Sequence, residues 1–313
     1  MERRSVLQGL LGMVLVPTAG RAASASAATG EGSRLFVASF MTMHDPFFVE
    51  LNEGMRMAVE SQGDRFLFLD GLHERSNQEK NTIEALNLHP AALFLVPATD
   101  AGSIEKIVAA AKEKGVPVIL VDTDLTAAEG MTLTTVLTDN REAGRIAGEE
   151  LARVNAKAQI GVLSFSYSQG CVDRVEGFRE EIAKHPGMRI LASQDGHANR
   201  EGVRGVIKEF LNSHAEMDAI FAINDVSALE AIDGIATAGR TGKIAVLGVA
   251  GSREGAQAIV AGKMLATVAQ MPKEIGRVAV EQARKFLAGG TVAKRVLVPV
   301  KLVTAANAEE FAK

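Results

Sequence analysis

Residues 116–122 read Val-Pro-Val-Ile-Leu-Val-Asp, an apolar run rich in β-branched residues that ends on a carboxylate. The run is apolar throughout, which is typical of a parallel strand covered by helices on both faces. Similar runs alternate with helical patterns along the chain, at 34–40, 65–70, 91–97, 159–166, 188–193, 219–225, 243–249 and 264–270. This spacing is that of βαβ units, so the sequence predicts an α/β protein with doubly wound parallel sheets.

One interval breaks this alternation. The strand that ends at Asp122 is followed by another at 132–138, and the residues between them leave no room for a helix. Roughly five βα units precede or surround this point and roughly four follow it. The length of 313 residues also suits two domains of ~150 residues each. We therefore expect two similar lobes rather than one large sheet.

The first 27 residues have the pattern of an export signal. Arg3 and Arg4 give a positive start, residues 6–16 form a short apolar run, and Ala-Ser-Ala at 25–27 is a small-residue cleavage site. The adjacent arginines resemble a twin-arginine signal, with Sec export as the alternative. No cysteine follows the apolar run, so the pattern favours a freely diffusing periplasmic protein over a lipoprotein.

Composition and motifs exclude several classes of function. The net charge is −4 with both signs mixed along the chain, so no basic field exists for nucleic acid or an anionic membrane. A single cysteine, Cys171, rules out a disulfide framework, and the six histidines lack metal-ligand spacing. Phosphate-loop, G-x-G-x-x-G and G-x-S-x-G motifs are absent. We therefore expect no catalytic residue, no metal and no cofactor.

Polar residues that follow apolar strands mark the candidate ligand site, because open α/β sheets bind ligands at the carboxyl ends of their strands. Four clusters qualify: Asp45-Pro46-Phe47-Phe48, Asp122-Thr123-Asp124, Asn224-Asp225 and Gln270. Each also has a purely structural interpretation. Asp45 and Asn224 suit helix N-caps, Asp122 suits a turn, Phe48 lies on an apolar helix stripe, and Gln270 suits a hinge or the surface.

The whole chain from residue 34 to about residue 303 resembles the periplasmic sugar-binding proteins of ABC transporters, specifically the ribose-type branch. The segments that carry the resemblance are 45–48, 116–122, 138–140, 174–178, 221–225 and 266–270. It implies two lobes that close on a ligand about three crossings, near Thr138, Gln270 and Pro299. The expected boundaries are 1–27 for the signal, 28–137 with 271–299 for the first lobe, and 138–270 with 300–313 for the second.

The resemblance also implies a ligand pocket. Its site residues would be Asp45, Phe47, Phe48, Asp122, Thr123, Val172, Asn224 and Gln270, with the two phenylalanine rings on the apolar face of a sugar. Thr123 and Val172 stand where ribose-type proteins carry arginines, and Ala250, Ala198 and Pro97 also depart from the family pattern. The expected pocket is therefore more apolar and net acidic, and ribose should bind poorly. We expect a less hydroxylated or bulkier carbohydrate-like ligand, with an amine-bearing molecule as the alternative.

The expected partner is an ABC transporter permease, served by a monomer that binds no nucleic acid. Presentation of the ligand to a sensor kinase or chemoreceptor is the alternative within binding proteins. A LacI-type repressor shares the two-lobe fold but needs a helix-turn-helix where this chain has the export pattern. A periplasmic hydrolase needs a nucleophile or paired carboxylates, for which Asp45 and Asp122 are the candidates.

Overall fold

The computed structural model describes residues 32–97, 101–124, 130–197 and 200–313. The export pattern at 1–27 and the departure at Ala198 lie outside the described residues. Within these residues the strands form two six-stranded sheets, which confirms the predicted α/β class. In the same part of the chain, no helix has the length and apolar character needed to cross a bilayer.

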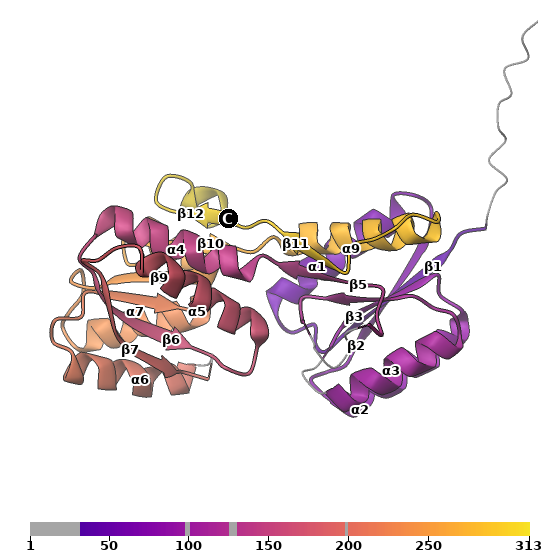
Figure 1. Ribbon diagram of the computed structural model, residues 1–313, viewed down its shortest axis with the longest axis horizontal. Helices are drawn as coiled ribbons and strands as arrows, with labels where there is room; N and C mark the ends of the chain where they lie inside the picture. Colours follow the sequence, from indigo (N-terminus) through magenta and orange to yellow (C-terminus); the bar gives the residue numbers. More distant parts are fainter. Residues whose placement is uncertain (1–31, 98–100, 125–129, 198–199) are drawn as a thin grey trace, which may run out of the picture. The chain divides into compact units, whose positions relative to one another are not determined.

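The first sheet has the strand order β11-β5-β4-β3-β1-β2, and all its strands are parallel. The helices α1 (Pro46–Glu60) and α9 (Pro272–Leu287) pack on one face, and α2 (Arg75–Ala85) and α3 (Ala101–Glu113) pack on the other (Figure 1). The central strands are buried along their whole length for this reason. The strands are β1 (Leu35–Phe40), β2 (Arg65–Asp70), β3 (Ala92–Val96), β4 (Val118–Val121), β5 (Thr134–Thr138) and β11 (Arg295–Val298).

The second sheet has the order β12-β10-β9-β8-β6-β7, and only β12 runs antiparallel to its neighbour. The helices α4 (Asn140–Val154) and α5 (Gln169–Ile182) cover one face. The other face carries α6 (Arg200–Ser213), α7 (Asp225–Thr237) and α8 (Arg253–Val260). The strands are β6 (Gln159–Ser164), β7 (Arg189–Asp195), β8 (Ala219–Ala222), β9 (Ala245–Ala250), β10 (Ala266–Ala269) and β12 (Lys301–Val303).

The two sheets repeat one plan. When their orders are set side by side, β1 corresponds to β6, β4 to β9 and β5 to β10. The chain passes from one sheet to the other after β5, after β10 and between β11 and β12, and the residues named as crossings, Thr138, Gln270 and Pro299, lie at these links. Gln270 Nε2 donates a hydrogen bond of 2.9 Å to Thr138 Oγ1, so two of the links contact each other.

The observed strands differ from the predicted ones at some ends. β8 stops at Ala222, whereas the sequence predicts a strand to residue 225, because Asn224 caps α7 and Asp225 begins it. β7 continues to Asp195, two residues beyond its predicted end. The short strands β11 and β12 are not among the predicted strands. Pro299 separates the apolar residues of the two strands, and each strand begins at an exposed charged residue, Arg295 or Lys301.

Each sheet carries one pair of helices in unusually close contact. A Cβ built on Gly144 of α4 would lie 1.9 Å from the carbonyl oxygen of Arg174 in α5, and one on Gly177 would lie 1.9 Å from that of Arg141. In the first sheet a Cβ on Gly54 of α1 would lie 2.2 Å from the carbonyl oxygen of Lys273 in α9. Glycine is therefore needed where these helices cross.

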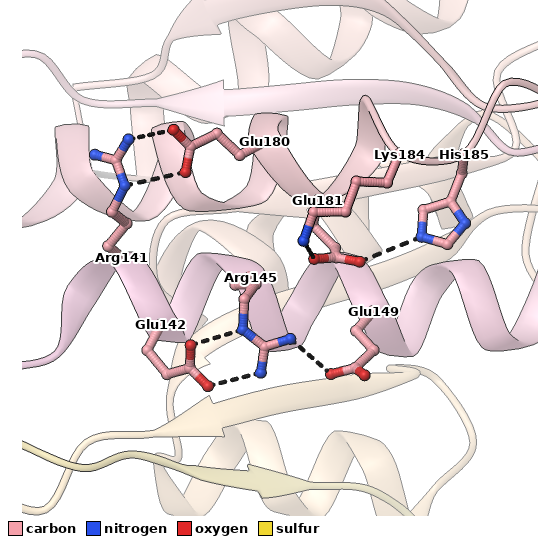
Figure 2. A network of polar contacts seen from close by, with 8 residues as sticks. All are labelled: Arg141, Glu142, Arg145, Glu149, Glu180, Glu181, Lys184 and His185. Carbon is pink, nitrogen blue, oxygen red and sulfur yellow. Dashed lines mark hydrogen bonds and ion pairs between the residues drawn. The ribbon is translucent and has the colours of Figure 1, made fainter.

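Ion pairs line the outer side of the α4–α5 crossing (Figure 2). Arg141 of α4 pairs with Glu176 at 2.8 Å and with Glu180, both on α5. Within α4, Arg145 binds Glu142 and Glu149 in the same view. These side chains are largely exposed, so solvent screens the pairs and packing at the glycines is the stronger contribution to the crossing.

Candidate ligand-binding site

The first cluster of site residues begins α1. Asp45 is the N-cap, its Oδ1 accepts the Phe47 N–H at 2.9 Å, and Pro46 takes the first helical position. Phe48 is 9% exposed and packs in the core, with Phe47 half-buried beside it at 5.4 Å between ring centroids. The capping interpretation of Asp45 is therefore correct, and its second oxygen leaves room for a ligand contact as well.

Asp122 lies directly after β4 in a left-handed backbone conformation, with φ of 65°. Aspartate tolerates this conformation better than most residues, and the Asp122 N–H donates to Val136 O at 2.9 Å. Burial raises the pKa of Asp122 from 3.8 to about 6. The Arg174 guanidinium opposes this rise in pKa, and the Asp45 carboxylate adds to it. Asp122 is thus a partly buried carboxylate whose ionised form is favoured by Arg174 and disfavoured by Asp45.

Thr123 and Asp124 continue this loop and are both partly buried. Asp124 forms an ion pair of 2.9 Å with Arg295 of β11. The same guanidinium lies 3.7 Å from Asp173 of α5. Arg295 therefore links the loop after Asp122 to the helix turn that carries Val172.

Arg174 is the residue that the sequence analysis did not select for the site. Its side chain is buried, with the residue 8% exposed, and it donates from Nε to Asn140 Oδ1 at 2.8 Å and from Nη1 to Ile223 O at 2.7 Å. Among the described residues, its Nη2 has no hydrogen-bond partner. Its positive charge lowers the pKa of Asp122 and offsets part of the negative charge that Asp45 and Asp122 bring. An arginine on the buried stripe of α5, beside Val175 and Phe178, is the signal that could have found it.

The remaining site residues mostly have structural partners. Asn224 caps α7, where its Oδ1 accepts the Ser227 N–H at 2.8 Å. Val172 lies half-exposed in the first turn of α5, and its N–H donates to Ser168 O at 3.0 Å. Gln270 is half-buried and hydrogen-bonded to Thr138. These roles fix where the side chains lie, and a ligand can still contact the atoms that the bonds leave free.

Asp225, next to Asn224, belongs to the framework instead. It is buried and accepts hydrogen bonds from Ser252 N at 2.7 Å, Ser252 Oγ at 2.8 Å and Thr267 Oγ1 at 2.6 Å. Burial raises the pKa of this carboxyl, and the three hydrogen bonds oppose that rise. Asp225 therefore ties the start of α7 to the loop after β9 and to β10.

Two aromatic residues after β6 also escaped the sequence analysis. Phe165 packs against the core of the second sheet, and Tyr167 is 76% exposed. Their ring centroids are 5.7 Å apart. The available signal was the place of Tyr167, just past the predicted strand 159–166.

Two surface grooves lie elsewhere. One of about 750 Å³ runs between α1 and α9 and is lined by Met57, Met271 and Val280, among others. The other, of about 520 Å³, lies between α6 and α7 around Ile207 and Leu211. Neither is lined by a strand-end residue of the candidate site. In the part of the chain that the structure describes, no three His, Cys, Asp or Glu side chains are placed to hold a metal ion.

Comparison with known proteins agrees with this geometry. The ribose import binding protein of Haemophilus influenzae is 32% identical over 288 residues, which cover 91% of this chain and 95% of that protein. Its Escherichia coli counterpart is 31% identical over 264 residues, 84% of this chain and 88% of that protein.

The fold has matches among solved structures. A periplasmic solute-binding protein of an Actinobacillus succinogenes ABC transporter, crystallised with D-allose, superposes with a TM-score of 0.79. The match covers 89% of this chain and 100% of that one at 22% identity, and so supports the fold alone. Residues 36–291 match the family model described as the periplasmic binding protein domain. The resemblance found in the sequence is confirmed, and the chain belongs to the periplasmic binding protein domain family.

Proposed function

We propose that this protein binds a small carbohydrate-like molecule and delivers it to the permease of an ABC importer. Its curated relatives include ribose import binding proteins, which are named for that role. The observation that carries the proposal is that the buried Arg174 of the second sheet lowers the pKa of Asp122, the carboxylate after β4 of the first, so the two charges act on each other. A carboxylate and a guanidinium with a free N–H group together accept and donate, as the hydroxyls of a polyol require.

The ligand enters between two lobes in this proposal. The first lobe is 28–137 with 271–299 and the second is 138–270 with 300–313, and the links at Thr138, Gln270 and Pro299 act as the hinge. Support comes from the strands, because β1–β5 and β11 share one sheet and β6–β10 and β12 share the other. Closure would bring Asp45, Phe47, Phe48, Asp122 and Thr123 to one side of the ligand, and Val172, Arg174, Asn224 and Gln270 to the other.

The same residues narrow the ligand class. Val172 offers no hydrogen bond and Thr123 offers only a hydroxyl, so a fully hydroxylated sugar would lose water partners there at about 1–3 kcal/mol per group. We therefore favour a ligand that is less hydroxylated or bulkier than ribose. Arg174 weighs against the amine-bearing alternative, because its buried positive charge would repel a cationic group.

Export to the periplasm, action as a monomer and release of the ligand unchanged complete the proposal. The export pattern at 1–27 and membership of a family of binding proteins support it. Delivery to a sensor kinase or chemoreceptor would use the same site and differ only in the partner.

A thermal unfolding screen tests the proposal directly. D-ribose, D-allose, xylitol and a set of deoxysugars and amines are each added to the mature protein. A true ligand at a hundred times its dissociation constant adds about 2.7 kcal/mol to the free energy of unfolding. The same ligand should lower the radius of gyration in X-ray scattering, and chromatography after long incubation should recover it unchanged.

Three outcomes would contradict the proposal in different ways. Stabilisation without a change in the radius of gyration would exclude the hinge. Recovery of a modified ligand would indicate an enzyme. Tight binding of D-ribose, at micromolar strength or better, would show that Thr123 and Val172 do not exclude it.

A further inference from the structure

The loop after β6 presents an exposed aromatic ring. Phe165 packs against the core of the second sheet, and Tyr167 is 76% exposed beside it, with 5.7 Å between the ring centroids. Single exposed apolar side chains are common on protein surfaces, so exposure alone says little. Two further observations, on the loop and on its place in the sheet, give this ring a role.

The loop that carries Tyr167 is fixed. Ser166, the residue between the two rings, donates from its backbone N–H at 3.0 Å and from its Oγ at 2.8 Å to one oxygen of Asp195. Asp195 ends the neighbouring strand β7, and its other oxygen accepts the His197 N–H at 2.7 Å. The Asp195 carboxylate therefore joins the ends of β6 and β7. These hydrogen bonds restrain the backbone of the loop that carries Tyr167.

The position of the loop matches that of the first aromatic cluster. β6 corresponds to β1 in the strand orders of the two sheets, and an aromatic pair stands between each strand and the body of the helix that follows it, in the first turn of α1 and in the loop before α5. After β1 the pair is Phe47 and Phe48, with Phe48 set in the core. After β6 the pair is Phe165 and Tyr167, with Phe165 against the core. In both sheets the more buried ring packs in or against the core, and the more exposed ring stands past the carboxyl end of its strand, the edge at which open α/β sheets bind ligands.

We propose that Tyr167 is the second lobe's aromatic contact for the ligand, covering an apolar face of the bound carbohydrate-like molecule. This inference rests on the proposed function and adds a specificity residue to it. An aromatic ring offers a flat apolar surface with few rotatable bonds, and the tyrosine hydroxyl can stay hydrated at the rim. A ligand with an extended C–H face would gain most from it, which agrees with the preference for a molecule less hydroxylated than ribose.

The composition of the chain gives a direct assay. It has no tryptophan and Tyr167 is its single tyrosine, so intrinsic tyrosine fluorescence reports on this ring alone. D-ribose, D-allose, xylitol and deoxysugars are titrated while iodide quenching of this fluorescence is measured. We expect the ligand that raises the unfolding temperature to protect Tyr167 from iodide.

Substitutions then test whether the contact matters. Tyr167→Ala should weaken binding of that ligand about two- to tenfold in calorimetry, and Tyr167→Phe should retain most of the affinity. The matched control is Phe286→Ala, which removes an exposed ring, 42% exposed, from the last turn of α9 and should leave affinity unchanged. Folding should be unaffected in all three variants, because each ring is on the surface.

The outcomes separate this inference from the proposed function. If a ligand stabilises the protein but iodide quenching is unchanged and Tyr167→Ala binds normally, the inference is overturned and the function stands. If no compound in the panel stabilises the protein, the proposed function fails and the inference fails with it.

Discussion

The two sheets follow one plan and differ in the charge they bring to their strand ends. The first ends in carboxylates, with Asp45 exposed as a helix cap and Asp122 desolvated after β4. The second brings a buried guanidinium, Arg174, and a capping amide, Asn224. Neither set alone combines a strong donor with a strong acceptor. In the proposed site, the repeated scaffold would therefore supply an accepting half from the first sheet and a donating half from the second.

The halves also differ in how their charge is held. Asp122 comes from a loop and depends on its backbone conformation, with φ of 65°. Arg174 comes from a helix and depends on two hydrogen bonds, to Asn140 and to Ile223 O. We therefore expect substitution of Arg174 to change stability through lost hydrogen bonds. Substitution of Asp122 should change stability by removing the cost of burying its charge.

The largest effect should follow the loss of Arg174. Arg174→Met keeps the length of the side chain but removes every donor, so the ligand loses a charge-assisted bond and affinity should fall roughly a hundredfold. Asn140 Oδ1 and Ile223 O also lose their donor, which should lower the free energy of unfolding by about 1–3 kcal/mol. Calorimetry and denaturant unfolding measure the two effects.

Arg179→Met, on the exposed face of the same helix, is the matched control for this substitution. It should leave both ligand affinity and stability close to those of the unaltered protein. Equal affinity in Arg174→Met and Arg179→Met would remove the guanidinium from the site and break the comparison between the halves.

The second effect concerns Asp122, whose pKa in the folded protein is about 6 against an ordinary value of 3.8. Below about pH 3 the carboxyl is protonated in both states, so its burial carries no electrostatic penalty. As the pH rises towards 6 the unfolded chain ionises first, and the free energy of unfolding falls. At about 1.4 kcal/mol per pKa unit, the free energy of unfolding falls by about 3 kcal/mol in total. It stays constant once the pH is well above 6.

Asp122→Asn removes this charge and tolerates the left-handed backbone. The variant should be about 2–3 kcal/mol more stable than the unaltered protein at pH 7.5 and equal to it at about pH 3. Denaturant unfolding across this range checks the difference, with Asp124→Asn as a control that removes a charge two residues away. A pH profile unchanged by Asp122→Asn would show that Asp122 titrates near its ordinary value.

These effects also show what the sequence could reveal. The fold class was predictable because long apolar runs such as 116–122 and 219–225 survive as buried strands. Asp45, Asp122 and Asn224 could be selected as site candidates because each lies at or after the end of a predicted strand in the sequence. Arg174 was missed because its role depends on Asn140 and Ile223, which come together only when α4, α5 and β8 pack.

A third, smaller effect separates the two close helix pairs. Gly144→Ala and Gly54→Ala each place a methyl group against a carbonyl oxygen of the facing helix, at 1.9 Å and 2.2 Å before relaxation. Overpacking should cost each variant about 1–3 kcal/mol of stability. Only Gly144 faces the backbone of Arg174, so only Gly144→Ala should also weaken the ligand, by about tenfold.

Denaturant unfolding and calorimetry of the two glycine variants make this comparison. A readout without ligand is the pKa of Asp122, followed by carboxyl NMR, because displacement of Arg174 removes the charge that lowers this pKa. Gly144→Ala should raise the pKa of Asp122, and Gly54→Ala should leave it unchanged. If both variants shift it alike, the helix pair of the second sheet has no special part in placing Arg174.

The smallest effect compares the two caps. Asp45→Ala and Asn224→Ala each leave one helix-terminal N–H without its acceptor, that of Phe47 or of Ser227, so each should lower stability by about 1 kcal/mol. Asp45→Asn and Asn224→Asp keep a capping oxygen, so these two variants should retain most of the stability of the unaltered protein.

The ligand affinities of these two variants should differ, however, because Asn224→Asp places a new negative charge in the half of the site that holds Arg174. Unfolding midpoints and calorimetry of the four variants separate capping from ligand contact, and equal affinity across all four would mean that both residues serve the helices alone.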